Sequence, residues 1–182
     1  YDTSLTKSSP TGWSAERTNC GAAAIGDHAL FAGGGDDNGN KVQSSVDAYD
    51  TSLTRTSAPA LTGPRRLVGA AIAGDHALFA GGVNRSGDTT RYYKTVDAYS
   101  ASLTRTSADT MSSGNSYSLK GTTVNKYALF AEEKYDSRVE AYNPSLTRVT
   151  VSPLSRSSPG YVVATAVGNY AIFSGSSLTA DV

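Results

Sequence analysis

The sequence of 182 residues predicts an all-β fold made of four tandem units. GDHALFAGG occurs at Gly26–Gly34 and again at Gly74–Gly82, and weaker copies follow at Asn125–Glu133 and Gly168–Ser176. The tyrosine of the YDTSLT-like segments recurs with the same period, about 43 to 51 residues, and no segment has a helical period. Repeats of this length made of short strands are typical of β-propeller blades. We place the unit boundaries near 1–48, 49–98, 99–141 and 142–182.

The second unit shows most clearly how a repeat divides into strands. Leu67–Ala73 is apolar without alternation and rich in small residues, as is typical of a strand buried on both faces near a propeller axis. A Gly-Asp turn leads into His76–Ala80, which ends at a Gly-Gly pair. Lys94–Tyr99 alternates apolar and polar residues, and Leu103–Ser107 is polar and threonine-rich, as suits an outer edge strand. We therefore expect four antiparallel strands in each unit, with the repeated phenylalanines and tyrosines in the core.

Charge balance and cysteine content argue against several classes of protein. With 16 basic and 16 acidic residues the formal net charge is zero, unlike that of a non-specific nucleic-acid binder or a polybasic membrane anchor. No apolar run approaches the roughly 20 residues of a membrane span. The one cysteine, Cys20, cannot form an internal disulfide. It aligns with Val68, so we expect a small buried apolar side chain there.

The order of features within a unit resembles the kelch repeat of β-propellers. In the second unit the resemblance rests on Arg65, Gly81-Gly82 and Val96-Asp97-Ala98-Tyr99. In the first unit it rests on Arg17, Gly33-Gly34 and Val46–Asp50. The pattern departs from the kelch repeat where a tryptophan is expected near Thr56 and Thr106, and in the last two units, which lack Gly-Gly. The segment VDAYDTSLTRT, residues 46–56, resembles the sequences of repeat proteins of bacterial and bacteriophage origin. The resemblance implies a four-bladed kelch-like propeller in an extracellular, cell-surface or virion-associated setting.

The two ends of the sequence have complementary places in the repeat. The last residues stop just before the position of the repeated tyrosine, and Tyr1–Thr6 resumes at that tyrosine. One interpretation is a closed propeller in which Tyr1–Lys7 pairs with the C-terminal strand of the last blade and so removes an exposed edge. A stretch of a longer array would have the same ends. A third interpretation is that two chains assemble into one larger ring.

Candidate catalytic and metal-binding residues are few. His28 and His76 occupy the same place in the repeat, where the other units have Tyr127 and Tyr170, so we interpret that position as packing beside a turn. The segment 36–40 looks like a calcium loop, but it lacks the spaced acidic ligands of an EF-hand, and a hairpin loop explains it better. We predict no catalytic residue, no metal site and no cofactor.

Binding residues are expected at one end of the units. The loop before the first strand and the loop between the second and third strands lie at the same end of an antiparallel unit, and there the units differ in length and chemistry. Tyr, Trp and Arg are the usual anchors of interfaces. The candidate partner-binding residues are Trp13, Arg17, Asp36, Asp37, Arg65, Arg66, Arg85, Arg91, Tyr92, Tyr93, Tyr117 and Tyr135.

The variable loops at one end of the units, with their Tyr, Trp and Arg residues, favour a non-enzymatic binding module whose partner is a protein or a surface glycan. We expect no nucleic-acid partner and no membrane insertion, and an oligomer or larger assembly fits the repeat. One alternative is a purely structural tandem-repeat component of a fibre or shell. Another is an enzyme, because the kelch resemblance also extends to oxidases and sugar isomerases. The inner strands, however, offer Gly, Ala, Val and Thr rather than metal ligands or paired acid–base groups.

Overall fold

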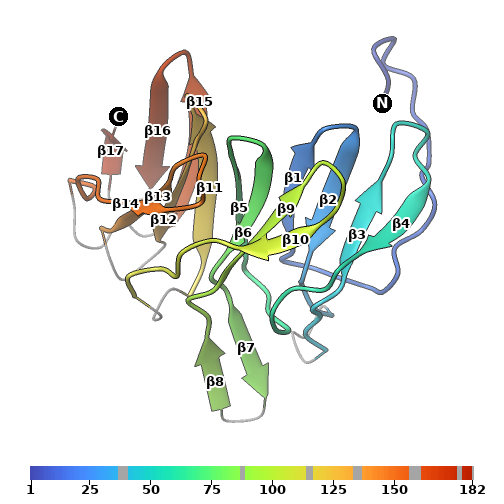
Figure 1. Cartoon of the computed structure of the whole chain (residues 1–182), viewed down its shortest axis with the longest axis horizontal. Coiled ribbons are helices and arrows are strands. Elements are labelled where there is room, and N and C mark those ends of the chain that lie inside the picture. The colour runs from blue at the N-terminus through green and yellow to red at the C-terminus, as the bar shows by residue number, and fades with distance from the viewer. Residues whose placement is uncertain are drawn as a thin grey trace.

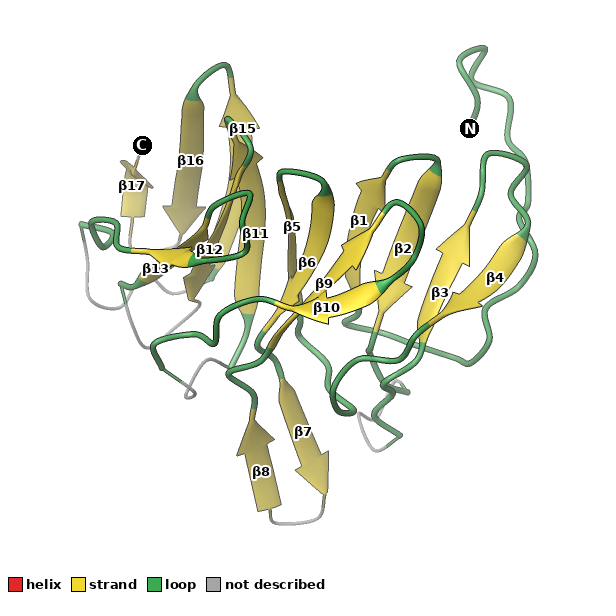
Figure 2. Cartoon of the chain, in the orientation of Figure 1, coloured by secondary structure: helices red, strands yellow, loops and turns green. Residues whose placement is uncertain are grey.

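The chain folds into four antiparallel sheets and one separate hairpin. The computed structural model describes residues 1–36, 41–86, 89–113, 117–132, 137–155, 161–175 and 178–181. In these ranges every regular element is a strand, and Figure 2 shows no helix among them. The all-β prediction is therefore confirmed.

Each sheet comes from one continuous part of the chain. Sheet 1 contains β1 (Gly21–Ile25), β2 (His28–Ala32), β3 (Val46–Tyr49) and β4 (Arg55–Ala58). Sheet 2 contains β5 (Gly69–Ala73), β6 (His76–Ala80), β9 (Val96–Ser100) and β10 (Arg105–Ser107). Sheet 3 contains β11 (Leu119–Val124), β12 (Tyr127–Glu132), β13 (Val139–Tyr142) and β14 (Arg148–Val149). Sheet 4 contains β15 (Val162–Val167), β16 (Tyr170–Gly175) and β17 (Leu178–Asp181), and the separate hairpin is β7 (Val83–Ser86) with β8 (Thr89–Tyr92).

The sheets stand in a row with their first strands side by side. Strand β5 lies against both β1 and β11, and β11 lies against β15. Figure 1 shows sheet 1 at one end of the row and sheet 4 at the other, with the chain termini at these opposite ends. The core lies between neighbouring sheets, and the first strands are rich in small residues because they approach one another closely. A Cβ added at Gly21 of β1 would lie 2.9 Å from the Phe79 ring of sheet 2.

The repeated aromatic residues occupy equivalent core positions. Phe79, Phe130 and Phe173 are buried, and so are Tyr49 in β3, Tyr99 in β9 and Tyr142 in β13. Each phenylalanine in sheets 1 to 3 lies edge-on against the tyrosine of its own sheet, with ring centroids 5.7 to 6.0 Å apart. The prediction of a shared aromatic core is confirmed for these residues. Phe31 of sheet 1 is the exception, because it is only half-buried.

The turn between the third and fourth strands is the same in each complete sheet. In sheet 1, Oδ1 of Asp50 accepts hydrogen bonds from the backbone N–H groups of Ser52 and Thr54, both at 2.9 Å. The leucine between them, Leu53, has a φ of 62°, and Leu103 and Leu146 in sheets 2 and 3 have φ values of 60° and 63°. A leucine in the left-handed region is uncommon, and its recurrence shows that the repeat dictates this turn.

Two expectations about the strands are corrected. Tyr1–Lys7 belongs to no strand and lies at the end of the row opposite β17, so it does not pair with the C-terminal strand of its own chain (Figure 1). Sheet 4 consequently has three strands rather than four within the described residues. The loop between the second and third strands of unit 2 also contains an additional element, the hairpin β7–β8.

Candidate functional site

The hairpin β7–β8 projects from one edge of the row of sheets (Figure 1). The segments that lead into β5 and β11 lie at the same edge, as the antiparallel geometry predicts. The tight turns between first and second strands, such as Gly74-Asp75, lie at the opposite edge (Figure 2). The edge that carries the hairpin is called the loop edge below.

The base of the hairpin is fixed to the segment before β5. Arg66 and Val83 form an isolated bridge in which each backbone N–H donates to the other's carbonyl oxygen at 2.9 Å. Tyr93 closes the base by donating its N–H to the carbonyl oxygen of Gly82 at 3.0 Å. Gly82 has a φ of 95°, and a Cβ there would lie 2.7 Å from the carbonyl oxygen of Arg66. Glycine is therefore required where the hairpin leaves the sheet.

Two arginines of the hairpin lie over tyrosine rings. Arg85 has its guanidinium carbon 5.4 Å from the ring centre of Tyr117, and the corresponding distance from Arg91 to Tyr93 is 4.9 Å. Arg85 pairs with Thr90 and Arg91 pairs with Asn84, so the two arginines project from opposite faces of the hairpin. We call Arg85, Arg91, Tyr92, Tyr93 and Tyr117 the hairpin cluster.

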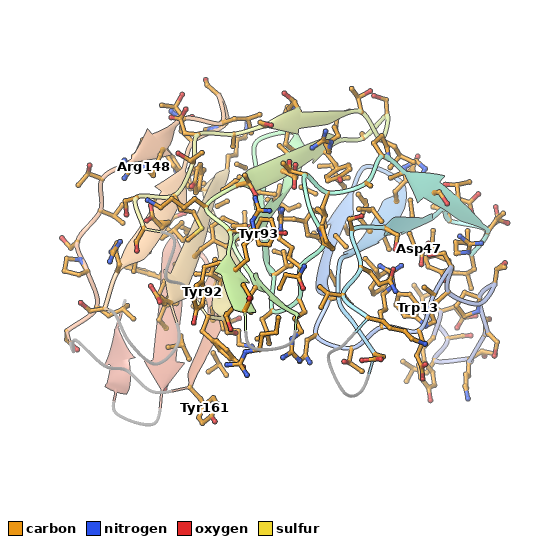
Figure 3. All side chains as sticks on the ribbon, turned by 90° about the horizontal axis from the view of Figure 1, so that it is seen from below. Trp13, Asp47, Tyr92, Tyr93, Arg148 and Tyr161 are labelled. Carbon is orange, nitrogen blue, oxygen red and sulfur yellow. The ribbon has the colours of Figure 1, made fainter. Side chains whose placement is uncertain are left out.

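The members of the hairpin cluster differ in exposure. Arg85 and Arg91 are exposed, and Tyr92 is 37% exposed beside the buried Tyr93 (Figure 3). Tyr93 packs on the backbone of Gly63, where a Cβ would lie 2.8 Å from its ring. No ion pair within the described part of the chain involves Arg85 or Arg91. These two guanidinium groups are therefore available to an anionic partner.

A buried ion pair supports the cluster from inside sheet 2. The guanidinium of Arg65 lies 5.3 Å from the ring centre of Tyr93 and donates to Oδ2 of Asp97 at 2.6 Å. Neither side chain of the pair is exposed. Burial acts to raise the pKa of Asp97, but Arg65, the N–H and hydroxyl of Thr62, and Arg105 outweigh it and hold the pKa below its ordinary value. This carboxylate stabilises the fold above the pKa of an unfolded Asp, about 3.9, and that contribution is lost as the pH falls through the depressed pKa.

The same ion pair recurs in sheet 1. Arg17 donates to Oδ2 of Asp47 at 3.0 Å and also to the carbonyl oxygens of Phe31, Gly33 and Ser45. The side chains of Arg17 and Asp47 have no exposed area. Sheet 3 has Glu140 at the acidic position, with Arg148 at 3.7 Å. Arg17 and Arg65 were expected to contact a partner, but their side chains are enclosed, so within this chain they join the segment before the first strand to its sheet.

Trp13 lies apart from the hairpin cluster. Its ring contacts Phe31 edge-on at 4.7 Å on the outer face of sheet 1, and the side chain is 48% exposed. Figure 3 shows Trp13 and Asp47 at the end of the row opposite Tyr161, with Tyr92 and Tyr93 between. A groove of about 390 Å³ beside Trp13 is lined by Phe31, Tyr49 and Leu53, among others. The structure therefore divides the candidate binding residues between two places.

The remaining candidate binding residues lie in different parts of the structure or outside its described residues. Arg66 is half-buried at the base of the hairpin, and Asp36 is half-buried beside sheet 1. Asp37 and Tyr135 lie outside the described residues, as does most of the calcium-like segment 36–40. The sequence reasoning did not single out Gly63 or Asp97 as parts of the site. An Arg before the first strand that recurs with an Asp in the third strand was the signal for Asp97.

The described part of the chain also contains candidate metal ligands and nucleophiles. There, no three His, Cys, Asp or Glu side chains lie close enough together to hold a metal ion. His28 and His76 begin β2 and β6 directly after the Gly-Asp turns. Cys20 is half-buried, and burial raises the pKa of its thiol. The described residues also contain no helix of the length and apolarity that crossing a membrane would need.

Comparison with known proteins gives a likeness of fold. No family model matches the sequence, and no curated protein matches it. The chain is similar to a solved structure entitled "Structure of YjhT", with a TM-score of 0.69 and 11% sequence identity. The match covers 90% of this chain and 58% of that one, so the chain spans less than two thirds of the neighbour's length. At this identity the two proteins share an arrangement of strands, and the comparison says nothing of a common activity.

Proposed function

We propose that the chain is a non-enzymatic binding module, a kelch-like propeller or an arc of one, that holds its partner at the loop edge. The observation that carries the proposal is the pair of exposed arginines on tyrosine rings at the hairpin. A cation over an aromatic face at an exposed site is worth about 0.5–1 kcal/mol. Ordering a long side chain on binding costs about the same, so guanidinium groups already held on rings bind with less loss of entropy.

The chemistry of the hairpin cluster indicates what the partner presents. Arg85 and Arg91 offer planar donor groups that match carboxylates, and Tyr92, which the register places on the same face of the hairpin as Arg85, offers an amphipathic ring. The partner therefore carries anionic groups beside a surface that packs on an aromatic ring. Carboxylated surface glycans and acidic protein segments both meet this description. The resemblance to bacterial and bacteriophage repeat proteins adds a surface or virion-associated setting to the proposal.

The test is binding of the 182-residue chain to an array that carries carboxylated glycans, neutral glycans, acidic peptides and neutral peptides. We expect binding to one of the two anionic classes, and that class identifies the source of the anionic group. Replacing Arg91 and Tyr92 by Ala should weaken this binding at least tenfold, which corresponds to about 1.4 kcal/mol. The melting temperature should change little, because both side chains are exposed.

The chain offers a matched control at the opposite edge. Lys126 and Tyr127 are also an exposed cation and tyrosine in sequence, and Tyr127 is 39% exposed. Replacing both by Ala should leave binding unchanged. If the two double variants bind equally well, or if the unmodified chain binds nothing on the array, the loop edge is not the binding site. The alternative of a purely structural repeat component would then be favoured.

A further inference from the structure

One edge of the hairpin β7–β8 is open to a further strand. The hairpin is a sheet of two strands that stands away from the four larger sheets (Figure 1). The outer edge of β7 is occupied at its base, because Val83 exchanges two backbone hydrogen bonds of 2.9 Å with Arg66. Within the described residues, no backbone hydrogen bond joins β8 to anything except β7. The outer edge of β8 is therefore a template for another strand.

The bridge at the base determines which groups of β8 lie on this open edge. In an antiparallel pair of strands, hydrogen-bonded and non-hydrogen-bonded residue pairs alternate. Val83 directs its N–H and C=O to Arg66, so its pair with Tyr92 is non-hydrogen-bonded, and so is the pair of Arg85 with Thr90. The backbone N–H and C=O groups of Thr90 and Tyr92 consequently point away from β7. They recur every two residues, about 6.8 Å apart, which is the spacing that an extended peptide matches.

The side chains beside the open edge carry positive charge that the chain itself does not neutralise. Arg91 in β8 and Arg85 in β7 are exposed, and neither forms an ion pair with a described residue. Strands β4 and β10 also lie at sheet edges, but Arg55 and Arg105 on them lie 3.2 and 2.7 Å from an aspartate of their own sheets. The edge of β8 thus differs from these edges in its attraction for an acidic strand.

The register specifies which side chains an added strand should present. Thr90 and Tyr92 lie on one face of the hairpin, and Arg91 lies on the other face. Side chains directly opposite one another on neighbouring strands have Cβ atoms about 4.5–5.5 Å apart, and they pair by charge or by apolar contact. An acidic residue opposite Arg91 and apolar residues opposite Thr90 and Tyr92 satisfy both faces. The matching sequence therefore alternates acidic and apolar residues.

We propose that an extended acidic segment of a partner protein adds to β8 as the third strand of the hairpin. This inference rests on the binding function proposed above, and it selects an acidic polypeptide over a carboxylated glycan. The reason is that a polypeptide backbone supplies donors and acceptors at the spacing of the open edge, so that main-chain bonds give affinity and alternate side chains give selectivity. The bridge between Arg66 and Val83 holds the base of the hairpin before the partner arrives, which lowers the entropic cost of binding.

Backbone methylation of a peptide separates strand addition from attraction between charges. The probe is a short labelled peptide that alternates Glu and Val, titrated against the 182-residue chain and followed by fluorescence anisotropy. Two further peptides carry N-methyl groups on all the Val residues or on all the Glu residues. Because N–H groups of a strand point alternately to its two sides, one methylated peptide should lose binding and the other should retain it. Loss with methylated Val would identify an antiparallel strand, and loss with methylated Glu a parallel one.

A proline in β8 tests the same edge from the side of the protein. Thr90→Pro removes an N–H that points away from β7, so the hairpin keeps its own hydrogen bonds and peptide binding should weaken about fivefold or more. The control is Ser107→Pro in β10. The hydrogen bond from the N–H of Ala108 to the carbonyl oxygen of Val96 shows that the N–H of Ser107 also points away from its sheet. Ser107→Pro should leave peptide binding unchanged.

Hydrogen exchange shows directly which amides the peptide covers. The amides of Thr90 and Tyr92 should exchange more slowly once the peptide is bound. The amides of Asn84 and Arg91, which pair within the hairpin, should stay protected in Thr90→Pro if the hairpin is intact. If that variant opens the hairpin, the two methylated peptides on the unmodified chain decide the question.

The outcomes separate this inference from the binding function on which it rests. Strand addition is overturned if both methylated peptides bind as well as the unmethylated one, or if Thr90→Pro with an intact hairpin binds normally. Selective binding of carboxylated glycans on the array overturns it too. In each of these cases the loop-edge function still stands if replacing Arg91 and Tyr92 by Ala weakens binding. A chain that binds neither acidic peptides nor carboxylated glycans contradicts both proposals.

Discussion

At the scale of single residues, the fold depends on a buried carboxylate in the third strand of each complete sheet. Asp97 accepts hydrogen bonds from Arg65, Arg105 and Thr62, so both of its carboxylate oxygens are paired within sheet 2. Removing one partner of a buried ion pair costs more than the pair itself contributes, because the other charge stays in a medium of low polarity.

Asp97→Asn should therefore lower the free energy of unfolding by about 3–5 kcal/mol, because Arg65 is left buried without its counter-ion. Urea unfolding followed by circular dichroism measures this loss. The control is Asp75→Asn in the exposed Gly-Asp turn of the same sheet, where we expect a change within about 0.5 kcal/mol. Equal effects of the two substitutions would mean that the Arg65–Asp97 pair does not hold sheet 2 together.

Residue roles could be predicted from the sequence only where a side chain acts through its position in the repeat. The burial of Phe79 and Tyr99 followed from periodicity, and the structure confirms it. Arg17 and Arg65 were predicted at the loop edge, but the sequence does not say that each guanidinium turns inward to an Asp, 30 residues later for Arg17 and 32 residues later for Arg65. Their burial depends on contacts between distant segments, which a local pattern does not contain.

At the scale of elements, the strands of unit 2 were predicted to within two or three residues, whereas the hairpin β7–β8 was not predicted. Its sequence, VNRSGDTTRYY, was interpreted as a variable loop. The alternation of apolar and polar residues is weak there, because the hairpin has no sheet to pack on. The Gly-Asp pair in its middle, which also marks the turns before β2 and β6, was the signal for a hairpin.

The stability of the fold should be sensitive to a single carbon atom added at the base of the hairpin. Gly82→Ala places a Cβ 2.7 Å from the carbonyl oxygen of Arg66 and holds an alanine at a φ of 95°. We expect it to lower the free energy of unfolding by about 2 kcal/mol or more. Gly168→Ala is the matched control, because Gly168 also has a positive φ of 55° but has open space around it. Its cost should be about 1 kcal/mol, and urea unfolding of the two variants compares them.

If both alanine variants lose the same free energy of unfolding, the base of the hairpin can shift to accommodate the added Cβ.

Binding of the two variants to the array adds an independent comparison. Gly82→Ala moves the segment that carries Arg85 and Arg91, so it should weaken binding even though neither arginine is changed. Gly168→Ala should leave binding as it is.

At the scale of the whole molecule, the period of the sequence predicted the number of units and the order of strands within them, but not the open row. Whether four sheets close depends on the rotation between each neighbouring pair, and small side chains at the first strands, such as Gly21 and Gly69, allow a range of approaches. Closure through Tyr1–Lys7 was wrong, because this segment and β17 lie at opposite ends of the row.

The leucines in the left-handed turns carry a conformational free-energy cost that is balanced in some sheets and not in others. A side chain at such a φ costs about 1–2 kcal/mol relative to an ordinary conformation. Leu103 and Leu146 offset this by packing against the core beneath the preceding sheet. Leu53 in sheet 1 has no such sheet beside it among the described residues, and it is 40% exposed. The single chain thus holds a strained residue at sheet 1 without the contact that balances it elsewhere.

Replacing the turn leucine by glycine should consequently have different effects on stability in sheet 1 and in sheet 2. In the single chain, Leu53→Gly should change the free energy of unfolding by no more than about 0.5 kcal/mol, because relief of strain and the added freedom of the unfolded chain nearly cancel. Leu103→Gly should lower it by about 1–2 kcal/mol through lost packing. Urea unfolding of both variants measures these values. The same turn therefore places a strained leucine where it adds little stability in sheet 1 and where it packs against the core in sheet 2.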